Sequence, residues 1–265
     1  MIEILSVEGV GPVELSVSER GSGRPVLLLH GGAGPASVAA WAELFARTQG
    51  VRVITPTHPG FAGTPRPETL RSISGLAELY AALLDKLRLN DVIVVGNSIG
   101  GWIAAELALA APSQVGGLVI VDGVGIVVPG HPVADAFTLP FEEIRRRSYH
   151  DPSRFVIDLA NVPPAQKAVI AGNQASLKAY AGGSGDPSLR ERLASVKVPT
   201  LVVWGESDRI ADADYGRAFA NAIPGAVFEL MAETGHVPQI ETPERLVEVL
   251  GRFVERQFPA NPGAS

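Results

Sequence analysis

The sequence of 265 residues contains no cysteine. This absence excludes disulfide bonds, catalysis by a thiolate and a zinc site with cysteine ligands. The five histidines include no pair at a metal-binding spacing such as H-x-x-x-H, and neither a G-x-G-x-x-G fingerprint nor a P-loop lysine is present. We therefore expect no metal and no cofactor.

Long apolar runs and an excess of positive charge are also missing. The net charge of −6 argues against a nucleic acid or an anionic membrane as a partner, although it selects no particular substrate. The most apolar stretch, residues 116–129, is too short to span a membrane and contains Asp122. The first residues do not resemble a signal peptide. We expect a cytoplasmic protein that acts on a small molecule; the oligomeric state stays open.

Apolar segments alternate with segments of helical periodicity along most of the chain. The chain is long enough for one large α/β domain. Residues 1–7 and 13–18 predict an antiparallel hairpin. The other predicted strands are residues 26–29, 51–55, 92–95, 118–121, 201–204 and 226–231. Continuous apolar strands separated by helices predict a mostly parallel, eight-stranded sheet with helices on both faces.

The alternation stops between residues 124 and 197. This stretch is far longer than ordinary loops, and it carries short helical patterns at residues 141–147, 152–160 and 165–180. We predict a helical cap at residues 124–197, inserted after the sixth strand. Residues 1–123 and 198–265 would form the core.

A G-x-S-x-G motif follows one of the predicted strands. Residues 96–101 read Gly-Asn-Ser-Ile-Gly-Gly and stand between an apolar strand and a long helical segment. This is the setting of a nucleophile elbow, in which a strained turn exposes the serine hydroxyl near a helix N-terminus. The pentapeptide alone is a weak signal, but its flanking elements favour Ser98 as a nucleophile.

Two further strands end in residues that complete a catalytic triad. Asp208 follows the strand at 201–204, and His236 follows the strand at 226–231. The order serine, aspartate, histidine is that of G-x-S-x-G hydrolases. Carboxyl ends of parallel strands meet at one sheet edge, so the three side chains are expected to converge there. His236 would act as the general base, and Asp208 would orient it.

Three other aspartates compete with Asp208 for the role of the acid. Asp122 also follows a strand, from which an acid can sometimes reach the histidine. Asp212 and Asp214 are instead typical of a helix start, where acids favour the helix dipole. We favour Asp208.

Five motifs in order resemble the serine hydrolases of the α/β-hydrolase fold over essentially the whole chain. They are the sequences at 30–32 (His-Gly-Gly), 59–61 (Pro-Gly-Phe), 96–101, 205–208 (Gly-Glu-Ser-Asp) and 235–236 (Gly-His). The resemblance implies an oxyanion hole built from the backbone amide of Ile99 and one in the loop at 30–34, where Gly32 is favoured over Ala33.

The chain departs from this family's pattern in the loop after the fourth strand. The loop commonly reads Asp-x-Pro-Gly-x-Gly, but Thr57 replaces the acid and Ala62 replaces the second glycine. His58 is therefore unexpected here, and we interpret it as a partly exposed loop histidine. A serine at position 98 makes dehalogenase and epoxide hydrolase chemistry improbable.

The nature of the substrate depends mainly on the cap. Its aromatic residues suit a small to medium ester with an apolar part, cleaved through an acyl-enzyme on Ser98. The arginine run at 145–147 is interpreted as a solvated helix face. His30 is expected to hold its loop by hydrogen bonds rather than to carry a proton. The candidates for contact with substrate are His30, Asn97, Phe137, Phe141 and Tyr149.

Two alternatives to an esterase remain. Asn97, Gly101 and the loop at 30–35 also resemble the carbon–carbon hydrolases that cleave ring-fission products of aromatic catabolism. In those enzymes a tryptophan usually follows the catalytic histidine and a cap arginine binds the substrate carboxylate. Here Val237 follows His236, and no single cap arginine can be aligned. The second alternative is a non-catalytic ligand-binding module on the same scaffold.

Overall fold

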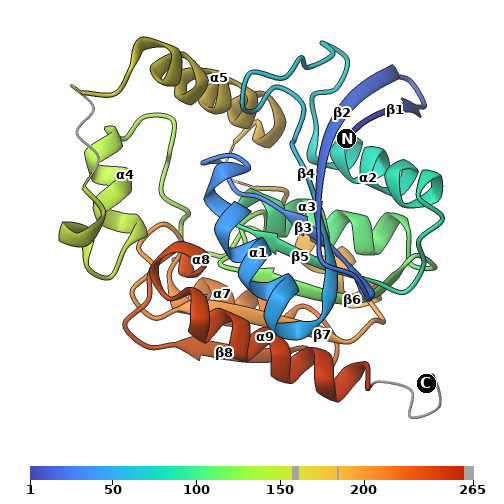
Figure 1. Cartoon of the computed structure of the whole chain (residues 1–265). Helices are drawn as coiled ribbons and strands as arrows, with labels where there is room; N and C mark the ends of the chain where they lie inside the picture. Colours follow the sequence, from blue (N-terminus) through green and yellow to red (C-terminus); the bar gives the residue numbers. More distant parts are fainter. Residues whose placement is uncertain (157–160, 184, 260–265) are drawn as a thin grey trace.

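A single eight-stranded sheet forms the centre of the molecule (Figure 1). The computed structural model describes residues 1–156, 161–183 and 185–259. The strand order is β1-β2-β4-β3-β5-β6-β7-β8. The β1–β2 and β2–β4 pairs are antiparallel, and the other pairs are parallel. The strands are β1 (Ile2–Val7), β2 (Gly11–Arg20), β3 (Arg24–Leu29), β4 (Val51–Pro56), β5 (Val92–Asn97), β6 (Val115–Val121), β7 (Thr200–Gly205) and β8 (Val227–Met231). The predicted sheet and its hairpin are confirmed.

Helices cover both faces of this sheet, which explains why its central strands are continuously apolar. Leu27 and Leu29 belong to one buried cluster, whereas Val26 and Leu28 belong to another, because successive strand residues point to opposite faces. The first cluster includes residues of α2 (Ile73–Lys86), α3 (Ile99–Ala110) and α7 (Ala213–Asn221). The second includes residues of α1 (Ala36–Gln49) and α9 (Pro243–Gln257).

The segment between β6 and β7 contains the remaining helices of the described residues, apart from the short α8 (Pro238–Glu241). They are α4 (Phe141–Ser148), the 3-10 turn η1 (Pro152–Phe155), α5 (Pro164–Ala181), α6 (Leu189–Arg192) and the 3-10 turn η2 (Leu193–Ser195). The patterns at 141–147 and 165–180 correspond to α4 and α5. Of the helix expected at 152–160, only η1 is seen, and residues 157–160 lie outside the described residues. None of the described helices is both long and apolar enough to cross a membrane.

Helix α5 is attached by hydrogen bonds to the loop that follows β4. The Asn173 side chain accepts from the backbone N–H of Ala62 at 2.8 Å. The hydroxyls of Ser176 and Tyr180 donate to the carbonyls of Gly60 and Pro59 at 3.0 and 2.9 Å. The Asn173 amide also donates to the carbonyl of Ala33 at 3.4 Å. Helix α5 therefore lies over the carboxyl ends of β3 and β4.

Candidate active site

Ser98 lies at a strained turn between β5 and α3. Its φ and ψ angles are 56° and −121°, outside the backbone regions that residues other than glycine favour. The turn is too tight for side chains on either side. A Cβ atom at Gly96 would lie 2.1 Å from the carbonyl oxygen of Gly100, and one at Gly100 would lie 2.2 Å from that of Leu29. These contacts explain the two glycines of the G-x-S-x-G motif.

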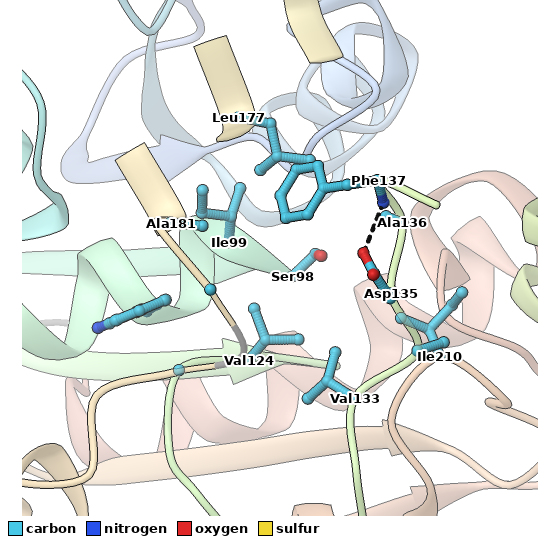
Figure 2. Close-up of a pocket in the computed structure, with 14 residues that line it drawn as sticks. Ser98, Ile99, Val124, Val133, Asp135, Ala136, Phe137, Leu177, Ala181 and Ile210 are labelled. Carbon is cyan, nitrogen blue, oxygen red and sulfur yellow. Dashed lines mark hydrogen bonds between the residues drawn. The ribbon is translucent and has the colours of Figure 1, made fainter. Parts of the chain in front are cut away.

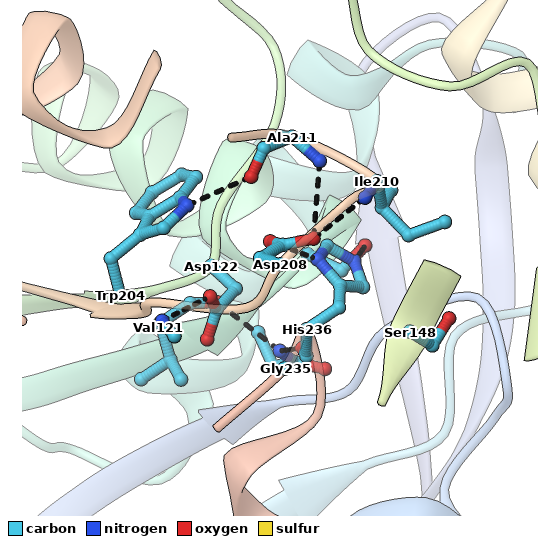
Figure 3. A network of polar contacts seen from close by, with 12 residues as sticks. Val121, Asp122, Ser148, Trp204, Asp208, Ile210, Ala211, Gly235 and His236 are labelled. Atoms are coloured by element: carbon cyan, nitrogen blue, oxygen red, sulfur yellow. Dashed lines mark hydrogen bonds and ion pairs between the residues drawn. The ribbon is translucent and has the colours of Figure 1, made fainter. Parts of the chain in front are cut away.

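The structure brings together the three residues that the sequence singles out as a triad. The Ser98 hydroxyl donates to Nε2 of His236 at 2.9 Å. Nδ1–H of His236 donates to Oδ2 of Asp208 at 2.7 Å, and Figure 3 shows these two side chains together. His236 is 6% exposed and Asp208 4% exposed. Donation at Nδ1 leaves Nε2 free to accept the serine proton, so this arrangement can activate Ser98 as a nucleophile.

Several donors hold the side chain of Asp208 in place. Its Oδ1 accepts from the backbone N–H groups of Ile210 and Ala211 at 2.7 and 3.2 Å, while Oδ2 accepts from His236. The hydrogen bond from His236 goes to Asp208 and to neither of the competing acids Asp122 and Asp212. Asp212 accepts from the N–H of Tyr215 at the start of α7, as expected of a cap. The Asp122 side chain accepts from β7 instead of from His236.

The two predicted sources of oxyanion donors, Ile99 and the loop at 30–34, both lie close to Ser98. Ile99 is the first residue of α3, so its N–H has no partner within the helix. In the loop at 30–34, a Cβ atom at Gly31 would lie 3.2 Å from Cβ of Ser98, and one at Gly32 would lie 2.9 Å from Leu177. Ala33 is exposed. The roles of Ile99 and Gly32 as donors stay predictions.

Two buried histidines support the loop that follows β3. His30 and His58 are both fully buried, with ring centroids 3.7 Å apart. His30 donates through Nδ1–H to the Gly31 carbonyl at 2.8 Å, and its Nε2 accepts the N–H of His58 at 3.1 Å. His58 donates through Nε2–H to the His30 carbonyl at 2.9 Å and accepts at Nδ1 from the hydroxyl of Tyr80. The expectation of a partly exposed His58 is wrong, because Tyr80 on α2 gives the ring a partner inside the core.

Both rings are neutral in the folded protein. Burial lowers the pKa of His58 to about 4, although its hydrogen bond to the His30 carbonyl opposes this shift. Burial, followed by the charge of His58, lowers the pKa of His30 well below its usual value. Each ring then donates through one nitrogen and accepts at the other, so the pair is fully satisfied only when it carries no charge.

We expect the free energy of unfolding to decrease as the pH falls from about 6.5 to about 4. In this window the unfolded chain binds a proton at His58 and the folded protein does not, so stability is lost with falling pH. His58 alone accounts for roughly 3 kcal/mol of this loss in the free energy of unfolding. The free energy of unfolding can be measured with urea at several pH values across this range. Its change with pH should be less steep in His58→Asn than in wild type, by the amount that corresponds to about one proton. His131→Ala, at a partly buried histidine outside the His30–His58 pair, is the control. An unchanged dependence of stability on pH in His58→Asn would contradict the assignment.

A cavity of about 260 Å³ opens beside Ser98 (Figure 2). Its walls are mostly apolar and come from α3, from α5 and from the loops after β6 and β7. The apolar side chains include Trp102, Val124, Val133, Phe137, Leu177 and Ile210. Within the described residues the lining includes no lysine and no arginine, and its one acidic side chain is that of Asp135. This surface suits an uncharged, apolar ligand.

Of the five residues predicted to contact substrate, the structure places Phe137 in the cavity wall. The other four lie elsewhere, for separate reasons. His30 is buried under its loop. The Asn97 amide donates to the carbonyls of Val121 and His236 at 3.2 and 3.1 Å, and so holds the catalytic loop. Phe141 and Tyr149 belong to α4 and its C-terminal end, where Tyr149 stacks on Phe155 with centroids 4.3 Å apart.

Sequence reasoning missed Trp102 and Leu177, which both line the cavity. A helical signal was available for each of them. Trp102 lies four residues after Ser98, one turn along α3. Leu177 and Ala181 are four residues apart, so they share one face of α5.

The comparisons with known proteins agree with this fold. Residues 26–249 match the alpha/beta hydrolase family, and the chain belongs to that family. It is 31% identical to the 2-hydroxymuconate semialdehyde hydrolase of Pseudomonas putida, over 90% of both chains. It is 28% identical to Lipase 1 of Psychrobacter immobilis, over 91% of this chain and 80% of that one.

Among solved structures, a thermophilic esterase from Thermogutta terrifontis superposes with a TM-score of 0.77. It is 23% identical and covers 97% of this chain and 99% of its own. The resemblance drawn from the motifs is confirmed, and the protein is a hydrolase.

Proposed function

We propose that the protein cleaves small to medium, uncharged and largely apolar carboxylic esters through an acyl-enzyme on Ser98. One observation carries the proposal: the hydrogen-bonded chain from Ser98 through His236 to Asp208 opens onto an apolar cavity without a cationic side chain in the described residues. A nucleophile with an oriented base suits acyl transfer, and the cavity suits an uncharged acyl or alcohol group.

The reaction would proceed in two halves. The Ser98 oxygen attacks the ester carbonyl while His236 accepts the serine proton at Nε2, and the resulting imidazolium is stabilised by Asp208. The N–H groups of Ile99 and Gly32 would stabilise the oxyanion. His236 then returns the proton to the leaving alcohol. A water activated by the same histidine would release the acid and restore Ser98.

The segment at 124–197 would act as the cap of this site. Leu177 of α5 and the stretch at 133–137 line the cavity together with Ser98 and Ile99 (Figure 2). These residues narrow the space above Ser98, so they would select substrates by size and exclude bulk water.

Hydrolysis of a carbon–carbon bond is the second candidate, favoured by the 31% identity to 2-hydroxymuconate semialdehyde hydrolase. The substrate in that name carries a carboxylate. Burying a carboxylate is costly without a cationic partner, and among the described residues the charged side chain that lines this cavity is the acid Asp135. The cavity therefore favours the ester. A purely binding role explains neither the aligned triad nor the strained turn at Ser98.

A panel of matched substrates tests the proposal. We expect nitrophenyl butyrate to be hydrolysed with a kcat/KM at least roughly tenfold above that of the anionic nitrophenyl hemiglutarate, because the charged group finds no partner in the cavity. A fluorophosphonate should label Ser98 of the folded protein. Rapid bleaching of a ring-fission dienoate with negligible ester turnover would establish the carbon–carbon hydrolase instead. Failure of the folded protein to be labelled would leave the binding role.

A further inference from the structure

Asp122 is a second buried carboxyl group beside the triad, and the reaction described above gives it no part. It follows β6 in a left-handed conformation with φ of 46°, and it is fully buried. Its Oδ1 accepts from the N–H of Gly205 at 2.8 Å. Its Oδ2 is buried and receives no hydrogen bond from any N–H or O–H group of the described residues. Such an orphaned oxygen is costly and calls for an explanation.

The surroundings of Asp122 are acidic. One carboxyl oxygen of Asp122, one of Asp208 and a ring nitrogen of His236 lie within 4.8 Å of one another. Figure 3 shows Asp122 beside the other two side chains. Glu241 of α8 adds another negative charge that acts on Asp122. Two buried carboxyl groups at this separation repel each other when both are ionised, so one of them keeps its proton.

The hydrogen bonds decide which of the two carboxyl groups is neutral. Asp208 accepts from two backbone N–H groups and from His236, whereas Asp122 accepts only from Gly205. Burial and the charge of Asp208 raise the pKa of Asp122 well above its usual range, and the charge of Glu241 adds to this. The hydrogen bond from Gly205 opposes the shift without cancelling it.

We propose that Asp122 is a positioning residue, a neutral carboxylic acid whose Oδ2–H donates to the carboxylate of Asp208. This hydrogen bond accounts for the orphaned oxygen and gives Asp208 a fourth donor. It also limits the pair of carboxyl groups to one negative charge. A second anion so close to His236 would stabilise the imidazolium and keep the base protonated near neutral pH.

The pH profile of the Asp122→Asn variant distinguishes a neutral Asp122 from an ionised one. The asparagine keeps an acceptor for Gly205 and supplies an N–H for Asp208 at almost the same size. We expect kcat/KM for the ester within about threefold of wild type, with the acidic limb of its pH profile unchanged. If Asp122 were ionised, loss of the anion would move that limb to lower pH by on the order of one unit or more, and this result would overturn the proposal.

The Asp122→Leu variant is the matched control, because leucine has a similar size and no polar atom. It removes the donor to Asp208 and leaves the N–H of Gly205 unpaired. We expect kcat/KM to fall roughly tenfold or more, and the acidic limb to move to higher pH as Asp208 becomes a stronger partner for the imidazolium. Identical profiles for the leucine and asparagine variants would exclude a donor role.

Two measurements on the folded protein need no turnover. At neutral pH, the infrared carbonyl band of an un-ionised carboxylic acid should be present in wild type and lost in Asp122→Asn. The folded wild type retains a proton on Asp122 that the unfolded chain releases, so the stability of the wild type falls as the pH rises. The asparagine variant has no such proton and does not lose this stability. Its melting temperature should exceed that of wild type by a margin that grows from about pH 5 to about pH 8.

The kinetic experiments rest on the proposed ester hydrolysis, whereas the infrared and melting experiments do not. Failure of the function alone would leave the carboxylic acid band in place. The proposal for Asp122 would be overturned if the carboxylic acid band were missing and the difference in melting temperature between Asp122→Asn and wild type did not change with pH. Ester turnover would persist in that case.

Discussion

Ser98→Ala is expected to lower kcat/KM for nitrophenyl butyrate by roughly 10⁵- to 10⁶-fold and to abolish labelling by a fluorophosphonate. The acyl-enzyme needs the Ser98 oxygen, and no other group can take its place at the strained turn between β5 and α3. Alanine removes only one atom, so the cavity beside it keeps its walls. Substrate binding should therefore persist, with an affinity close to the wild-type KM for the same ester.

Ser195→Ala is the control for this variant. The Ser195 hydroxyl donates to the carbonyl of Arg192 at an exposed turn far along the chain from the elbow. Its loss should leave activity and labelling unchanged. If Ser98→Ala retained more than about one hundredth of the wild-type rate, another nucleophile or a directly activated water would have to be responsible.

His236→Ala is expected to cost nearly as much as Ser98→Ala, and the double variant should be no slower than the poorer single variant. The serine hydroxyl is a weak nucleophile until a base accepts its proton, so each residue is ineffective without the other. Values of kcat/KM for the wild type, both single variants and the double variant complete a double-mutant cycle. Additive losses, with a double variant slower than either single one by another 10³-fold or more, would contradict a shared proton transfer.

His131→Ala is the matched control, because His131 pairs with Asp212, is no part of the triad and is only partly buried. An external imidazole provides a second check. The space left by the His236 side chain adjoins Ser98, so added imidazole should restore part of the lost rate in His236→Ala and none in Ser98→Ala. Equal rescue of both variants would place the proton acceptor elsewhere.

The sheet and the triad geometry were accessible from the sequence for one physical reason. In a parallel sheet every carboxyl end lies at the same edge, so residues that follow different strands become neighbours whatever their distance along the chain. Ser98, Asp208 and His236 each follow such a strand. The apolar runs define the strands because both faces are covered, and the glycines beside Ser98 report a turn with no space for a Cβ atom.

The surroundings of the site depend on side-chain contacts that no local pattern reveals. His58 lies in a loop rich in proline and glycine, which is typical of the surface, yet Tyr80 of α2 accommodates it in the core. Phe141 and Tyr149 are aromatic, as is typical of a ligand pocket, but neither side chain lines the cavity beside Ser98. The sequence identified Asp122 only as an alternative acid, because its relation to Asp208 exists only once two strand ends are adjacent.

The attachment of α5 has a consequence for altering selectivity. The helix that presents Leu177 to the cavity is also joined through Asn173 to Ala33 and Ala62, beside the proposed oxyanion donor. A substitution that tilts α5 to admit a larger acyl chain therefore also shifts the backbone that polarises the carbonyl. Substitutions in α5 are therefore expected to change the turnover rate and the preferred length of the acyl chain together. The stretch at 133–137 also lines the cavity and makes none of these hydrogen bonds to the loops after β3 and β4, so it is the better place to broaden specificity at constant rate.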